Sequence, residues 1–189
     1  MTGIIFASSN DFRLGINKAF LEFDGIRPID NILSVYKKIF SEIIIVTNDP
    51  LSYIEFPEAV VVADIYKNKG ALGGIYTGLF YASHDYSFVA ACDMPFLNEG
   101  FIIYLTGQVG KHDIIVPELP EGFQPLHAIY SRNYLSHIKK LLNADKLKIA
   151  GFYKEVRLLS IPEEKIKPFN KDGRLFLNIN TPKNLKAHQ

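Results

Sequence analysis

The fold is decided by the stretch GIIFASSND at residues 3–11, where a continuous apolar run ends abruptly in four polar residues. Three more runs of this kind follow, IIIV at 43–46, VVV at 60–62 and FVAA at 88–91. Continuous runs rich in β-branched residues predict strands that are buried on both faces, whereas alternation predicts a sheet with one face in water. We therefore expect a parallel sheet at the start of the chain.

Helical patterns separate these runs. Apolar residues recur at i, i+3, i+4 and i+7 spacing over residues 29–40, and Pro28 stands where the first turn of a helix tolerates proline. A second, less regular helix is expected over residues 73–83, where Gly74 and Gly78 lower the helix propensity. Strands that alternate with helices are typical of an α/β protein, with an open, mostly parallel central sheet and helices on both faces.

The second half of the chain has a mixed pattern. Residues 114–116, 126–130 and 156–161 indicate strands, and residues 134–142 carry one apolar helical face. Residues 176–180 alternate like a final strand, and the following Thr181-Pro182 is a cap and first-turn signal for a short terminal helix. Because no repeat, low-complexity tract or linker interrupts the chain, one domain is the simplest expectation.

Length and charge limit the possible functions. The 189 residues fit one domain of the usual size, roughly 150 residues, and 48% hydrophobic residues are enough for a core. Lys and Arg number 21 against 20 Asp and Glu, which leaves a net charge of +1. That balance argues against nucleic acid as a partner, because nucleic acid requires a broad basic surface, but it permits a local phosphate site.

The single cysteine, Cys92, excludes a disulfide framework within the chain and fits a reducing compartment. No basic residue next to it would lower its pKa, so we interpret it as a small apolar core residue. Apolar runs do not exceed five residues, far short of the roughly 20 that span a bilayer, and no secretory leader is recognisable. We therefore expect a cytoplasmic protein without a membrane partner.

Polar residues follow each of the four predicted strands. Arg13 and Lys18 follow the first, Asn48 the second, Asp64 the third and Asp93 the fourth. Because ligands bind at the carboxyl ends of parallel strands, we expect these residues to line one crevice. Backbone N–H groups and two cations can bind a triphosphate there, and a carboxylate is the ligand that Mg²⁺ takes beside nucleotide phosphates. The alternatives are a solvated loop and ordinary turn-capping roles.

Other conspicuous residues have simpler interpretations. The stretch GALGGI at 70–75 permits either the close approach of a ligand or tight packing of a helix on the sheet. The five histidines show no metal-ligand spacing, and for His127, in a predicted strand, we favour packing.

Taken together, the motifs resemble those of the molybdenum cofactor guanylyltransferases. FASSNDFRLGINK at residues 6–18 resembles the family's LAGGxSxRMGxDK, GIRP at 25–28 its GKP, and GALGGI at 70–75 its GPLxGI. CDMPF at 92–96 matches the family motif in full, while QPLHAIY at 124–130 resembles QPLxAxY and NINTP at 178–182 the closing NINTP. The order and spacing hold from Gly3 to Leu185.

The resemblance implies a single-domain Rossmann-like nucleotidyltransferase fold, similar to glycosyltransferase A, with residues 1–97 as the nucleotide-binding half and 98–189 as the acceptor-side half. It implies transfer of GMP from Mg²⁺-bound GTP to molybdopterin, forming the guanine dinucleotide cofactor and releasing pyrophosphate. By motif position, the implied catalytic residues are Arg13, Lys18 and Asp93, with Asp93 also the metal ligand; the nucleotide-binding residues are Phe6, Ala7, Ser8, Lys18, Asn48, Asp64 and Asp93; and the acceptor-binding residues are Asn178 and Asn180.

Several residues depart from the family pattern. Ser8-Ser9 replace two glycines, Asp11 replaces serine, Asn17 replaces aspartate and Ala71 replaces proline. A serine held in the left-handed backbone region costs about 1–2 kcal/mol, and its side chain narrows the space for a base. Two alternatives therefore stay open: a nucleotidyltransferase for another nucleotide or acceptor, and a catalytically silent nucleotide-binding homologue. Besides GTP and molybdopterin, proteins of cofactor biosynthesis and molybdoenzymes are candidate partners.

Overall fold

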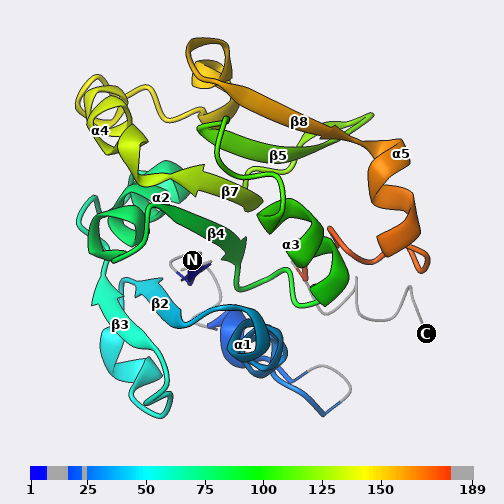
Figure 1. Cartoon of the computed structure of the whole chain (residues 1–189). Coiled ribbons are helices and arrows are strands. Elements are labelled where there is room, and N and C mark those ends of the chain that lie inside the picture. The colour runs from blue at the N-terminus through cyan, green and yellow to red at the C-terminus, as the bar shows by residue number, and fades with distance from the viewer. Residues whose placement is uncertain (8–16, 23–24, 180–189) are drawn as a thin grey trace.

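A computed structural model describes residues 1–7, 17–22 and 25–179 of the chain (Figure 1). Within these residues, eight strands form one sheet in the order β3-β2-β1-β4-β7-β5-β6, and β8 also pairs with β5. The strands are β1 (Thr2–Phe6), β2 (Glu42–Thr47), β3 (Val60–Ala63), β4 (Tyr86–Ala91), β5 (Ile114–Leu119), β6 (Gly122–Phe123), β7 (His127–Ser131) and β8 (Leu158–Pro162).

Helices cover both faces of this sheet, as the alternating pattern predicts. α1 and α3 pack into one core cluster and α2 and α4 into the other. None of the described helices is long and apolar enough to cross a membrane. The helices are α1 (Pro28–Ile39), α2 (Gly70–Tyr81), α3 (Glu99–Thr106), α4 (Leu135–Asn143) and α5 (Glu163–Ile166), with 3-10 turns η1 (Lys18–Phe20), η2 (Pro50–Tyr53), η3 (Arg132–Tyr134), η4 (Ile149–Glu155) and η5 (Lys167–Phe169).

Strand direction determines where a site can form. β1 pairs in parallel with β2 and β4, and β3 in parallel with β2. β7 is antiparallel to both β4 and β5, so β5 and its parallel partner β8 run in the same direction as β4. The carboxyl ends of β1 to β5 and of β8 therefore lie along one edge of the sheet, here named the carboxyl edge.

Two glycines of α2 allow this helix to lie close to β1. A Cβ atom on Gly74 would lie 2.1 Å from the Phe6 ring, and one on Gly78 would lie 2.6 Å from the Ile4 side chain. Both distances are too short for real atoms, so a larger residue would push the helix off the sheet. Of the two roles considered for this glycine-rich stretch, tight packing is the one that the contacts support for Gly74.

The expected strand over residues 176–180 is not present in its described part. Residues 176–179 pair with no strand, although the Ile179 N–H donates to the Asp93 carbonyl oxygen at 2.8 Å. Alternation misled the prediction because residues 176–178, which are half-buried, and the buried Ile179 pack at the carboxyl edge, where no ladder continues. Asn180 and the predicted terminal helix lie outside the described residues.

The pattern also missed α3 and placed the start of α2 three residues late. α3 carries the run FIIYL at 101–105, which hides any 3.6-residue period. Its start is marked by Asn98, whose side-chain oxygen accepts from the Phe101 N–H at 3.0 Å. α2 begins at Gly70, which has φ +60°, a conformation that glycine adopts without strain.

Candidate active site

The end of β1 lies between the ends of β2 and β4. The Ala7 N–H donates to the Val46 carbonyl at 2.8 Å, and the Phe6 carbonyl accepts from the Cys92 N–H at 3.0 Å. Phe6 and Ala7 are both buried. The sheet thus holds the point from which the predicted nucleotide-binding loop departs. Ser8 and Arg13, which that loop carries, lie outside the described residues.

Asp93 lies directly after β4 and is buried, with 9% of its surface exposed. Burial raises the pKa of its carboxyl group, and the nearby positive charge of Lys18 partly offsets this effect. Within the described part of the chain, no side chain donates a hydrogen bond to the Asp93 carboxylate, although its own backbone N–H does. The fold therefore brings the charges of Lys18 and Asp93 close together and leaves the carboxylate unpaired with any described side-chain donor.

The position of Lys18 depends on the residue before it. The Asn17 side-chain oxygen accepts from the Ala19 N–H at 3.1 Å, which caps η1. The Asn17 amide nitrogen also lies 3.1 Å from the Tyr53 hydroxyl oxygen, and burial raises the pKa of Tyr53. Sequence reasoning noted Asn17 as a departure from the family motif but missed this role, because its partner Tyr53 is distant in sequence.

Asn48 follows β2 at the same edge and is half-buried. Its Oδ1 atom is buried and has no hydrogen-bond partner among the described residues. A buried polar atom without a partner is costly, so such an atom at a site marks a place where a ligand donor fits. The predicted nucleotide contact of Asn48 has this geometry in its favour.

Asp64, which follows β3, accepts hydrogen bonds from other residues of the protein. Its Oδ1 atom accepts from the Thr77 hydroxyl at 2.7 Å and from the Tyr66 N–H at 3.0 Å. The Thr77 hydroxyl oxygen in turn accepts from the Ile65 N–H at 3.0 Å. These bonds fasten the loop after β3 to α2. The role of Asp64 as a nucleotide contact stays a prediction beside this anchoring role.

The predicted acceptor side meets Asp93 through the backbone. Asn178 is half-buried, and the hydrogen bond from the Ile179 N–H to the Asp93 carbonyl brings it beside the end of β4. Asn180 lies outside the described residues. Of the residues implied for catalysis and binding, the structure thus gathers Lys18, Asp93 and Asn178 around one strand end.

His127 and Cys92 belong to the core below this edge. The His127 ring is fully buried between Phe88, Phe101 and Phe176, with centroid distances of 5.0 to 5.7 Å. Burial lowers its pKa to about 3. Cys92 forms no disulfide and is buried, with 1% of its surface exposed. Both therefore have the packing environment that the sequence interpretation favours.

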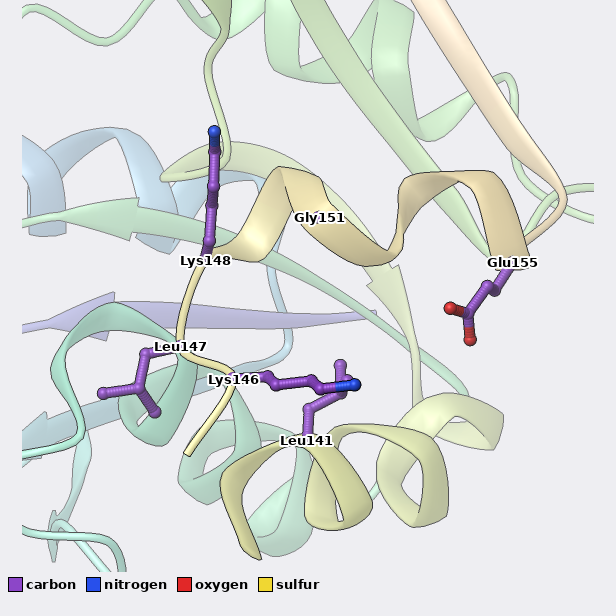
Figure 2. Close-up of a pocket in the computed structure, with 6 residues that line it drawn as sticks. All are labelled: Leu141, Lys146, Leu147, Lys148, Gly151 and Glu155. Carbon is purple, nitrogen blue, oxygen red and sulfur yellow. The ribbon is translucent and has the colours of Figure 1, made fainter. Parts of the chain in front are cut away.

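Two of the cavities of the structure are lined entirely by described residues. One of about 340 Å³ lies between α4 and η4, where the Lys146 amine points into the space below the Glu155 carboxylate and Lys148 points away (Figure 2). It contains none of the implied site residues. The other, of about 310 Å³, lies at the carboxyl edge next to the ends of β5 and β8; its lining is Leu119, Pro120, Glu121, Glu163, Asn170, Gly173, Phe176 and Leu177.

Comparison with known proteins identifies the family of the chain. Residues 3–157 match the model of the MobA-like NTP transferase domain. A molybdenum cofactor guanylyltransferase from Desulfosudis oleivorans is 38% identical over 188 residues, covering 98% of this chain and 93% of the relative. A probable molybdenum cofactor guanylyltransferase from Peptoclostridium acidaminophilum is 31% identical, with 99% and 87% coverage.

A solved structure extends the likeness to three dimensions. Molybdopterin-guanine dinucleotide biosynthesis protein A from Archaeoglobus fulgidus superposes with a TM-score of 0.84 at 25% identity, covering 100% of this chain and 96% of that chain. The fold and the relatives matched over nearly the whole chain point to the same family. The chain belongs to the MobA-like NTP transferase family, among whose members it is similar over nearly its whole length to molybdenum cofactor guanylyltransferases, and it is a nucleotidyltransferase.

Proposed function

We propose that the protein transfers GMP from GTP to the terminal phosphate of molybdopterin, forming the guanine dinucleotide cofactor and releasing pyrophosphate. The observation that carries the proposal is the buried Asp93 carboxylate at the end of β4, within electrostatic reach of Lys18. A cation and a carboxylate at one strand end are what a nucleoside triphosphate and its counter-ion require. The guanylyltransferase relatives support GTP and molybdopterin as the substrates.

Asp93 fits a magnesium ion. Magnesium is usually held by one or two carboxylates together with substrate phosphates and water, so a single well-placed carboxylate is sufficient. The Asp93 carboxylate is buried, makes no hydrogen bond to another described side chain, and lies at the edge where ligands of α/β sheets bind. When bound there, Mg²⁺ would supply positive charge that neutralises the triphosphate oxygens.

In the proposed reaction, an oxygen of the molybdopterin phosphate attacks the α-phosphorus of GTP. A new P–O bond forms as the bond between the α-phosphorus and the bridging oxygen breaks, and pyrophosphate leaves with that electron pair. No covalent intermediate with the protein is needed. The Lys18 ammonium, together with Arg13, stabilises the negative charge that spreads over the phosphate oxygens, and positioning by the sheet edge supplies most of the remaining rate enhancement.

Each half of the chain would bind one of the two substrates. Residues 1–97 would bind the nucleotide through the backbone of Phe6, Ala7 and Ser8, with Asn48 receiving a donor from the base at its unpartnered Oδ1. Residues 98–189 would bind the acceptor, with Asn178 and Asn180 beside it. The site between them, at the end of β4, is where the two phosphates meet.

A transfer assay with α-labelled GTP, Mg²⁺ and purified molybdopterin tests the proposal. We expect label in the dinucleotide product and equimolar pyrophosphate. Thermal denaturation with Mg²⁺ and each of GTP, ATP, CTP and UTP tests the base, because a ligand that binds only the folded state raises the melting temperature. A larger shift with a base other than guanine would contradict the GTP assignment, and no shift with any nucleotide at millimolar concentration would indicate a catalytically silent protein.

A further inference from the structure

The Arg174 side chain lies over the ring of Phe96, the third residue after Asp93. Its guanidinium carbon lies 4.7 Å from the centroid of the Phe96 ring, and its Nε donates to Asp172 Oδ2 at 2.8 Å. The side chain is 43% exposed. The ring and the carboxylate together favour one orientation of the Arg174 guanidinium before any ligand arrives.

The free side of this guanidinium is suited to an anion. Arg174 uses Nε for Asp172, and within the described residues its two terminal amino groups make no hydrogen bond. These groups are the planar pair that binds a phosphate through two parallel hydrogen bonds. Both side chains of the ion pair between Arg174 and Asp172 remain in contact with water. Solvent therefore screens the pair, and the positive charge of Arg174 still attracts an anion.

Arg174 lies on the acceptor side of the carboxyl edge. The segment that carries it returns to the end of β4 within five residues, where the Ile179 N–H meets the Asp93 carbonyl. On the nucleotide side, Asn48 and the end of β1 lie in the other direction along the sheet, because the strand order is β2-β1-β4. An anion at Arg174 is therefore on the opposite side of Asp93 from the proposed base site.

The same segment forms a wall of the 310 Å³ cavity. Gly173, Phe176 and Leu177 line it, together with the turn after β5 and the start of α5. β5 is two strands from β4 in the sheet, a separation of roughly 10 Å at the usual strand spacing. This volume is at the lower end of the range for small-molecule sites.

Negative and positive side chains lie at different places on this surface. Glu121 and Glu163 line the cavity, whereas Arg174 stands next to Phe96 on the Asp93 side. Carboxylates repel a phosphate but accept hydrogen bonds from the N–H groups of a heterocycle. A molecule with a phosphate at one end and an N–H-bearing ring at the other would be oriented with its phosphate toward Asp93.

We propose that Arg174, seated on Phe96, binds the phosphate of the acceptor, while the adjoining cavity receives the acceptor's heterocycle. This inference rests on the proposed function and deepens it, because it makes Arg174 a residue that selects and orients the acceptor. Phe96 is then a positioning residue, which acts by holding the guanidinium.

The test compares Arg174→Ala and Arg174→Lys with the wild type, using molybdopterin and its dephosphorylated form as probes. Isothermal titration measures binding of each probe, and steady-state assays measure kcat/KM for molybdopterin and KM for GTP. Loss of a charged hydrogen bond predicts molybdopterin binding about 10- to 100-fold weaker in Arg174→Ala. Binding of the dephosphorylated form and KM for GTP should change less than two- to three-fold, and Arg174→Lys should recover part of the loss.

Arg157→Ala is the matched control. Arg157 is an exposed arginine paired with Asp113 at 2.7 Å, and it lies before β8, at the opposite edge of the sheet. It should leave binding of both probes unchanged. Thermal denaturation of every variant checks that it folds.

The outcomes separate the two proposals. Equal weakening of both probes, or unchanged molybdopterin binding in a folded Arg174→Ala, overturns the role of Arg174 while guanylyl transfer by the wild type still stands. If the wild type neither binds molybdopterin nor transfers label to it, the proposed function fails, and the acceptor role of Arg174 fails with it.

Discussion

The Ile179 N–H donates a hydrogen bond of 2.8 Å to the Asp93 carbonyl oxygen. This bond joins the C-terminal segment to the loop after β4, so a residue implied for the acceptor, Asn178, is held next to the carboxylate implied for the metal. The backbone, rather than a side-chain contact, makes the connection. Substitutions at Asp93 should therefore change its chemistry without releasing the segment.

Asp93→Asn should abolish most of the Mg²⁺-dependent activity and leave the melting temperature equal or higher. The activity falls because an amide is a poor magnesium ligand. Stability is kept because the variant removes a buried charge, whose cost is what raises the pKa of this carboxyl. Activity against Mg²⁺ concentration, with calorimetry, checks both. Unchanged metal dependence would return Asp93 to a turn-capping role.

The pH dependence of kcat/KM should show the titration of Asp93. A raised pKa means that Asp93 takes up a proton at higher pH than an ordinary aspartate, and a protonated carboxyl does not bind Mg²⁺. We therefore expect the acid limb of the wild-type kcat/KM profile to lie above the usual aspartate range. Higher Mg²⁺ should move this limb to lower pH, because metal and proton compete for one site.

Lys18→Ala should lower kcat/KM for GTP by about 100-fold or more, since preorganised charge aimed at the reacting phosphates contributes that much in comparable sites. Lys37→Ala is the control, because Lys37, an exposed residue of α1, forms its ion pair with Glu58. Near-normal turnover of the Lys18 variant would show that the reacting phosphates lie elsewhere.

Asn48→Ala should raise KM for GTP several-fold with little loss of stability. Its Oδ1 atom has no hydrogen-bond partner among the described residues. Truncation to alanine therefore breaks no hydrogen bond between this oxygen and those residues. Inosine triphosphate, which lacks the exocyclic amine of guanine, probes whether that amine is the donor. If the ratio of GTP to ITP affinity is the same in wild type and variant, Asn48 does not receive that amine.

Thr77→Val tests the anchoring role of Asp64. Loss of the 2.7 Å bond leaves a buried carboxylate without its hydroxyl donor, which should cost about 1–3 kcal/mol of unfolding free energy. Asp64→Asn keeps an acceptor oxygen and should cost less. If Asp64 also contacts the nucleotide, Asp64→Asn will raise KM for GTP beyond what Thr77→Val does, and a double-mutant cycle measures the coupling.

His127→Leu should flatten the dependence of stability on acid pH. The pKa of His127 is about 3 in the folded protein and near 6.5 in an unfolded chain. Between these values the unfolded chain binds more protons, so the free energy of unfolding falls as pH falls from 6.5 toward 3. At pH 5 this loss is about 2 kcal/mol. Urea denaturation at pH 7 and pH 5 checks it; equal losses in wild type and variant would contradict the prediction.

Local sequence patterns were sufficient for the frame of the fold. The runs at 43–46 and 88–91 are apolar throughout because β2 and β4 have neighbours on both sides and helices on both faces, and these constraints act residue by residue. The same logic failed at residues 176–179, where alternation reflects packing at a sheet edge rather than a ladder.

The sequence by itself determined the parallel strands, the helices on both faces and the edge at which polar residues collect, because periodicity and strand ends are local properties. Only the tertiary structure decided that the charge of Lys18 lies near Asp93. It also decided that Asn17 forms a hydrogen bond with Tyr53, and Asp64 one with Thr77. It alone seated Arg174 on Phe96. The residues of each pair lie on different elements of the chain, and their contacts depend on how the sheet, its helices and its loops pack, which no local pattern records.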